Sequence, residues 1–239
     1  MKKTKKIWLI IAICLIVSGA LVCFFTLFAM GFDFQKLSTE NKITRNFEIN
    51  KSFDSINIVS DGCNINLVRS NGEKYTAVYQ GDEKTDISLK CENGVLTLNS
   101  SGSDNWIDYI GMSTFGNEIT LYLPDKCFKK ICIKTSSGAV NIKNCDTDTL
   151  NANTSSGAVD IKDCNADISN INTSSGNVSF NFLSAEKVKI KTSSGNVYGS
   201  FADERTYTVS SSSGNISVPE NSCGKPCEIT TSSGNITVE

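Results

Sequence analysis

A six-fold repeat of about 19 residues fills the C-terminal half of this 239-residue chain. Every unit contains Thr-Ser-Ser-Gly or Ser-Ser-Ser-Gly, and the spacings between successive glycines are 19, 19, 19, 19 and 20 residues. A fixed period of this length is the sequence signature of supersecondary units stacked into a solenoid. The six glycines are Gly138, Gly157, Gly176, Gly195, Gly214 and Gly234.

Alternation within each unit identifies the kind of solenoid. Apolar residues stand two positions before the Thr or Ser and two and four positions after the glycine, as Ile133, Val140 and Ile142 do in the first unit. Alternate apolar positions rich in β-branched residues are typical of strands with one buried face, and no helical period persists across a unit. The pattern predicts an all-β fold, a single-stranded β-solenoid (parallel β-helix or β-roll) with coils of about 19 residues.

The Ser-Ser-Gly segment is predicted to form a corner in each coil. A sharp corner often requires a positive φ, which glycine adopts without steric cost. Stacked coils lie roughly 4.8 Å apart, so the Thr/Ser positions form columns whose hydroxyls can bond to one another and to the corner backbone. We therefore interpret the six corner glycines as structural residues.

Residues 46–124 lack the motif but keep the β pattern. Alternating segments such as 55–59 and 119–123 are separated by turn dipeptides, of which Asn93-Gly94 is one. We expect residues 46–130 to form irregular coils at the start of the same stack and residues 131–239 to form the regular repeats. Because the sequence stops at Glu239 on the last repeat, we expect that last coil to leave an edge open to pairing.

The first 30 residues have the pattern of a membrane anchor. Residues 1–6 carry four lysines, and residues 7–30 contain no charge, a length that spans about 30 Å of hydrocarbon as a helix. The positive-inside rule then places the N-terminus in the cytoplasm and the following domain outside the cell membrane. The predicted organisation is a cytoplasmic tail at 1–6, one transmembrane span at 7–30, a linker at 31–45 and an extracellular solenoid at 46–239.

Two alternatives exist for this segment. A cleaved signal peptide usually has an apolar stretch of about 7–15 residues before a small-residue cleavage site, and Ala29-Met30-Gly31 is a poor version of that site. Cys23 suggests a lipoprotein, but Val22 before it is larger than the small residue expected there. We therefore favour an uncleaved anchor.

Composition restricts the chemistry of the part beyond the span. The 19 Lys/Arg that remain after the four N-terminal lysines face 25 Asp/Glu, a net charge of −6. Nucleic acids and anionic lipids are bound by basic patches, so this balance argues against nucleic acid as a partner. The chain has no His, which removes the side chain that most general-base and metal-binding schemes use. We expect no cofactor, no metal and no catalytic residue.

Eight of the ten cysteines lie beyond the span. Cys145 and Cys164 occupy one register position, which Leu183 and Ala202 fill in later coils, so we favour buried free thiols there. A disulfide is the alternative, because adjacent coils hold their Cα atoms about 5 Å apart. Cys223-Gly-Lys-Pro-Cys227 coincides with the one-residue insertion in the last repeat, where a small loop closed by a disulfide is a further alternative.

Residues 99–117 form the longest stretch outside the repeat pattern. They carry Trp106, Tyr109 and Phe115 among Gly, Ser and Asp residues. A long loop with aromatic side chains is typical of a binding surface, so these three residues define a candidate interaction loop. The alternative is a lid that packs the rings over the stack.

The residues resemble a bacterial family of membrane-tethered β-strand-repeat proteins, a domain of unknown function labelled as a candidate adhesin. The resemblance rests on Ile119-Thr-Leu-Tyr-Leu-Pro124, on Ile131-Cys-Ile-Lys-Thr-Ser-Ser-Gly138 and on the iterated Ser-Ser-Gly units. Phe53-Asp-Ser-Ile-Asn-Ile58 and Gly94-Val-Leu-Thr-Leu98 fit its first half. The resemblance covers about residues 46–239 and implies the fold. Similar proteins occur with envelope-stress systems of Gram-positive bacteria, which implies an accessory or sensor role.

The favoured function is a non-catalytic, adhesin-like scaffold that contacts an envelope polymer or another membrane protein. A sensor of envelope stress is the first alternative. A polysaccharide-acting enzyme would need clustered acids, and the nearest set is Asp160, Asp163 and Asp167. Asn replaces the first two of them one coil earlier, so we interpret these acids as solvated surface residues. Ice binding through the threonine column is disfavoured because Ser211 interrupts it.

Overall fold

The computed structural model describes residues 2–29, 42–72, 74–102, 116–220 and 223–239. The chain divides into two compact units, and the larger one comprises Lys42–Asp104 and Phe115–Glu239. The smaller unit contains helix α1 (Lys2–Ala29). Within α1, Ile11–Ala29 is long and apolar enough to cross a bilayer. Trp106, Tyr109 and Phe115 of the predicted interaction loop lie outside the described residues.

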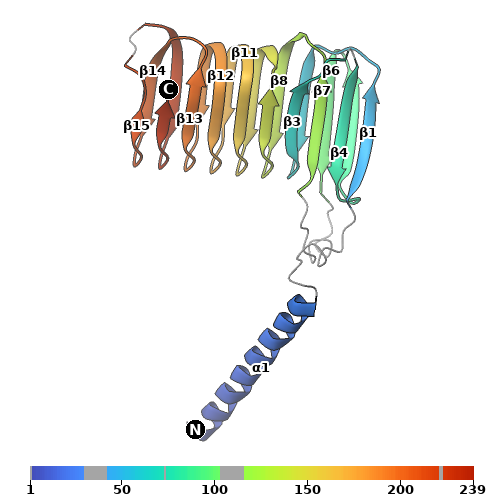
Figure 1. Cartoon of the computed structure of the whole chain (residues 1–239), viewed down its shortest axis with the longest axis vertical. Helices are drawn as coiled ribbons and strands as arrows, with labels where there is room; N and C mark the ends of the chain where they lie inside the picture. Colours follow the sequence, from blue (N-terminus) through green and yellow to red (C-terminus); the bar gives the residue numbers. More distant parts are fainter. Residues whose placement is uncertain (1, 30–41, 73, 103–115, 221–222) are drawn as a thin grey trace. The chain divides into compact units, whose positions relative to one another are not determined.

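The larger unit is a β-solenoid with two sheet faces and one core between them (Figure 1). Each regular coil contributes one strand to each face, because the Ser-Ser-Gly corner turns the chain between them. Strands β11 and β12 continue through the second bend and belong to both faces. The predicted all-β solenoid of about 19-residue coils is thereby confirmed.

The strands of the two faces follow from their pairing. The first sheet contains, in spatial order, β5 (Asp86–Glu92), β6 (Val95–Ser101), β2 (Ser55–Ser60), β8 (Cys127–Thr135), β10 (Asp146–Thr154), the second halves of β11 (Val159–Asn172) and β12 (Val178–Lys191), β16 (Lys225–Thr231) and β14 (Arg205–Ser211). The second sheet contains β1 (Ile43–Ile49), β4 (Tyr75–Gly81), β7 (Glu118–Leu123), β3 (Asn64–Arg69), β9 (Val140–Lys143), the first halves of β11 and β12, β13 (Val197–Phe201), β17 (Ile236–Val238) and β15 (Ile216–Ser217).

The order of coils in space differs from their order in the sequence. The last coil, β16–β17, lies between β12–β13 and β14–β15: Ile229 pairs with Ile190 on one side and with Val209 on the other. The expectation that the final repeat is the exposed end of the stack is therefore wrong. Among the described residues, the coil β14–β15 occupies that end, and Ile216 on it is 43% exposed.

The opposite end of the stack is closed by antiparallel strands. Coil β2–β3 stacks directly on β8–β9, and coil β6–β7 stacks outside it. Strands β5, β4 and β1 then pair antiparallel at the margins. The predicted turn at Asn93-Gly94 joins β5 to β6 with both residues at positive φ (50° and 76°), as a tight hairpin turn requires. The irregular half thus starts the stack with degenerate coils, and antiparallel strands cover its outer margin.

The cysteine register is close to the prediction. Cys145 and Cys164 are buried free thiols in adjacent coils, and Leu183 pairs with Cys164. The next residue in this row is Phe201 and not Ala202, because the register shifts between Phe180 and Leu183. Cys227 is buried in the core whereas Cys223 is exposed, and both are free.

One buried charge was not anticipated. Arg205, at the start of β14, is fully buried and forms an ion pair with Asp203. Its guanidinium lies 4.6 Å from the centre of the Phe201 ring and donates to the carbonyl of Ala185. Lys225 on β16 contacts the other oxygen of Asp203 at 2.8 Å. This cluster connects the outer coil to its neighbours. Removal of one charged partner would leave a buried charge uncompensated.

Candidate functional site

The repeated threonine is a structural part of each corner. In the coil of Thr173, the buried hydroxyl accepts the N–H of Gly176 at 3.0 Å and donates to the carbonyl of Gly157 in the preceding coil at 3.4 Å. The same pair of bonds recurs at Thr154, Thr192, Thr231 and Ser211. Each of these five hydroxyls therefore satisfies one corner amide and connects two coils, so we assign the column a structural role.

The corner glycines are required for a different reason from the predicted one. None of the six has a positive φ. A Cβ added at Gly176 would clash with the carbonyl oxygen of Gly157, and each other corner glycine faces a backbone carbonyl of the neighbouring coil in the same way. Gly234 faces Gly195, and Gly214 faces Gly234. Glycine is required here because the backbones of neighbouring coils approach closely. The glycine contacts follow the same interleaved order of coils as the strand pairing.

The outer face of the second sheet carries a row of polar side chains that crosses the strands. Neighbours in the row are register partners, about 4.8 Å apart in adjacent strands. Two of them, Asn66 and Asn141, are joined by an amide hydrogen bond of 2.8 Å. The row comprises Thr120, Asn66, Asn141, Asp160, Ser179, Tyr198 and Thr237.

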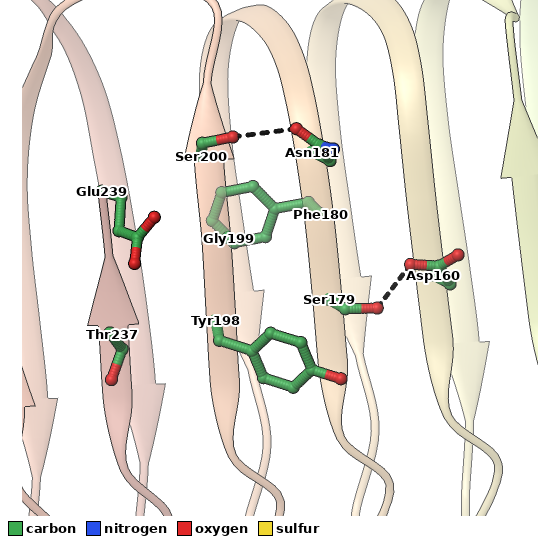
Figure 2. Close-up of a pocket in the computed structure, with 9 residues that line it drawn as sticks. All are labelled: Asp160, Ser179, Phe180, Asn181, Tyr198, Gly199, Ser200, Thr237 and Glu239. Atoms are coloured by element: carbon green, nitrogen blue, oxygen red, sulfur yellow. Dashed lines mark hydrogen bonds between the residues drawn. The ribbon is translucent and has the colours of Figure 1, made fainter.

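The C-terminal part of this row lines a hollow of about 460 Å³ (Figure 2). Tyr198 on β13 is 50% exposed and presents its ring beside Ser179 of β12. The hydroxyl of Ser179 donates to Asp160 at 2.5 Å. Gly199 pairs with Phe180, whose buried ring fills the space that a side chain at Gly199 would take, and both residues line the bottom of the hollow.

The remaining walls of this hollow come from neighbouring rows. The hydroxyl of Ser200 donates to the amide oxygen of Asn181 at 3.1 Å. Thr237 and Glu239 extend the hollow onto β17 (Figure 2). Because β17 lies beside β13 only through insertion of the last coil, the interleaved coil order builds this side of the hollow.

A second hollow of about 360 Å³ lies further along the same face. Its polar centre is Asn66, whose amide donates to Glu118 at 2.6 Å and to Thr120 at 3.3 Å. Asn141 and Lys143 complete the side towards β9. Asn141 lies one strand from Asp160 of the first hollow, so the two hollows belong to one continuous polar surface.

The sequence profile of Toastrack DUF4097 matches residues 53–239, most of the chain. The chain belongs to the Toastrack DUF4097 family. The expected resemblance to an adhesin-like domain of unknown function is thereby confirmed at the level of family and fold. Among curated proteins, no sequence matches this Toastrack chain.

Solved structures from three bacteria are similar to this Toastrack chain. A protein of Clostridium sporogenes, described as a candidate cell adhesion protein, is 14% identical with a TM-score of 0.48 and covers 84% of this chain and 99% of its own. A candidate adhesin of Bacteroides fragilis is 15% identical with the same TM-score and coverage. A candidate lipid-binding protein of Parabacteroides distasonis is 14% identical with a TM-score of 0.38 and covers 83% and 98%.

The three acids considered for catalysis do not converge in the Toastrack domain. Asp160 lies on the second sheet, Asp163 occupies the bend with a φ of 52°, and Asp167 lies on the first sheet. Across the described ranges, no group of three or more His, Cys, Asp or Glu is placed to hold a metal ion. Asp160 instead supports the hollow through its bond from Ser179.

Sequence reasoning missed the residues that line the hollows of the Toastrack domain. Tyr198 occupies a position that alternates with core residues in a regular repeat, and other coils carry Asn, Asp, Ser or Thr there. One signal was available, since Tyr198 and Gly199 together depart from the consensus of the earlier units. A large exposed aromatic ring among small polar side chains is the pattern of a shallow binding surface.

Proposed function

We propose that this Toastrack protein is a membrane-anchored scaffold whose solenoid binds an extended, uncharged glycan of the cell envelope on the outer face of the second sheet. The observation that carries the proposal is the hollow around Tyr198, with an exposed aromatic ring surrounded by hydroxyl, amide and carboxylate groups. An aromatic face packs against the C–H face of a sugar ring, while the polar groups hydrogen-bond its hydroxyls. The binding is non-catalytic.

The polar row supports a polymeric rather than a monomeric ligand. Its seven positions follow one another across seven strands, a distance of about 29 Å at 4.8 Å per step. Several groups in the row are already oriented by hydrogen bonds to their neighbours, as Asn66 and Ser179 are. Preorganised groups lose less conformational freedom when a ligand binds, so a linear glycan can be held by many modest contacts.

The anchor and topology complete the proposal. Ile11–Ala29 has the length and composition of a membrane span, and the lysines before it favour a cytoplasmic N-terminus. We place the solenoid outside the cell in a single-pass arrangement, where it meets envelope polymers. An N-terminal mass that begins after Gly31 would instead identify the helix as a cleaved signal.

Binding can be measured on the full-length protein in phosphatidylcholine nanodiscs. Soluble tetrasaccharides of N-acetylglucosamine and of glucose are titrated by calorimetry against the wild type and against Tyr198→Ala. We expect at least one of them to bind, and Tyr198→Ala to weaken binding about tenfold, because the ring supplies the apolar contact.

Tyr122→Ala is the matched control, since Tyr122 is a half-exposed tyrosine on the same sheet that lines neither hollow. It should bind like the wild type. Absence of binding to both glycans, or equal losses in the two variants, would reject the glycan site. A Tyr198→Phe variant should retain most of the affinity, because it keeps the ring.

A further inference from the structure

The outer face of the first sheet carries a cluster of lysines that the acidic composition conceals. Five lysines lie there in three adjacent rows: Lys130, Lys134, Lys187, Lys189 and Lys191. All five are exposed. Between β2 and β14 these rows contain one acid, Glu228, which pairs with Lys189 at 2.9 Å. We call these five lysines the lysine face.

Three members of the lysine face stand on one strand. In β12, Lys187, Lys189 and Lys191 alternate with the buried Val188 and Ile190, so their side chains leave the sheet on the same side at intervals of about 6.7 Å. Lys134 is the register equivalent of Lys191 three coils away, a separation of about 14 Å. Lys130 and Lys187 are related in the same way.

Asparagines occupy the two central coils of the face. Asn170 donates to Asn151 and Asn172 donates to Asn153, both at 3.0 Å. Each donated bond uses one of the two N–H groups of an amide, so the other remains available to an acceptor. Amide donors therefore lie between the lysines of the outer coils. A row of acids, comprising Asp148, Asp167 and Glu186, borders the lysine face on one side.

We infer that the lysine face binds a linear polyanion with a phosphodiester in each short repeat, such as a polyol phosphate of the cell envelope. Ammonium groups at regular intervals match successive phosphates, and charge complementarity is the property that distinguishes this face from the rest of the acidic domain. Exposed large apolar side chains, which are needed to enter a bilayer, are scarce here: among the described residues of these rows they are Val59 and Ile168. A soluble polymer therefore fits the face better than a membrane surface.

Titration of the full-length protein in phosphatidylcholine nanodiscs with soluble poly(glycerol phosphate) tests this inference. Lys187→Gln/Lys191→Gln should raise Kd roughly 10- to 30-fold at about 0.1 M salt. It should also reduce the slope of log K against log salt by about 1.5, because two phosphate contacts are lost. Lys187→Arg/Lys191→Arg should retain binding, since it keeps both charges.

The matched control is Lys74→Gln/Lys162→Gln, which removes two exposed lysines that belong neither to the lysine face nor to the two hollows: Lys162 lies on the second sheet and Lys74 precedes its strand β4. It changes net charge equally and should leave binding of the polymer unchanged. Equal losses in the two double variants would overturn the inference, because attraction would then depend on net charge alone. Stronger binding of the nanodiscs to phosphatidylglycerol vesicles than to the polymer, lost in Lys187→Gln/Lys191→Gln, would identify a membrane-docking face and would also overturn it. So would failure of the wild type to bind poly(glycerol phosphate).

Discussion

Substitution of the corner glycines tests the interleaved order of the coils. Gly234 is the last corner of the sequence but lies inside the stack, whereas Gly214 belongs to the coil at its end. A Cβ atom essentially never lies closer than 3.0 Å to a heavy atom of another residue. Gly234→Ala would bring its Cβ more than 1 Å closer than this to the carbonyl oxygen of Gly195. The two coils must separate by about that distance, because the neighbouring atom is backbone.

The cost follows from the hydrogen bonds at this corner. Ser233 and Ser232 donate their N–H groups to Ser193 at 3.0 and 3.1 Å, and the Thr231 hydroxyl donates to Gly195 at 3.3 Å. Lengthening these contacts by 1 Å breaks all three. At about 1 kcal/mol for each lost bond, Gly234→Ala destabilises the protein by about 3 kcal/mol, or about 6–12 °C in Tm for a domain of this size.

Gly214→Ala should cost less than half as much. Its Cβ meets the carbonyl of Gly234 equally closely, but the outer coil has a neighbour on one side only among the described residues and can tilt away. Thermal unfolding of the full-length protein in detergent, followed by far-ultraviolet circular dichroism, measures both variants. Gly62→Ala is the control, because a Cβ there meets nothing within 4 Å. A larger loss in Gly214→Ala than in Gly234→Ala would refute the interleaved order.

Three further predictions concern single side chains. Thr173→Val should lower the free energy of unfolding by about 1–3 kcal/mol in chemical denaturation, because it leaves the N–H of Gly176 without its acceptor. Thr173→Ser keeps the hydroxyl and should lower it by less than half of that amount. Phe182 has a φ of 52° and is 58% exposed, so Phe182→Asn should raise Tm by a few degrees. Asn144 holds the same bend position two coils earlier with a φ of 54°, and a lower Tm would show that the ring contributes more than the strain. Although burial opposes it, hydrogen bonds from the Asn117 amide and from Thr85 hold the pKa of Asp82 below its usual 3.8. The carboxylate therefore contributes stability above pH 3.8 that is lost as pH falls through the lower folded pKa, and denaturation midpoints between pH 5 and pH 2 should fall less steeply in Asp82→Asn than in the wild type.

Local sequence determined the elements of this protein. The 19-residue period, the alternation around each glycine and the Asn93-Gly94 turn are consequences of strand geometry and backbone sterics, which depend on neighbours in the chain. The core positions of Cys145 and Cys164 followed from register alone. The reason that glycine occupies each corner could not be read in this way, because it is the approach of a carbonyl from another coil.

Tertiary structure decided which coils are neighbours and where the binding surfaces lie. Nearly identical repeats offer one another equivalent hydrogen bonds and apolar contacts, so the pattern of a repeat does not specify its partner. Two features outside the pattern coincide with the change of order: the one-residue insertion near Cys223 precedes the strand that enters the stack, and the ion pair of Arg205 with Asp203 lies in the outer coil beside it. That choice places Thr237 and Glu239 beside Tyr198. Stacking of the coils likewise brings lysines that are distant in the sequence onto one face of an acidic domain. Lys134 and Lys187, for example, are 53 residues apart in the sequence.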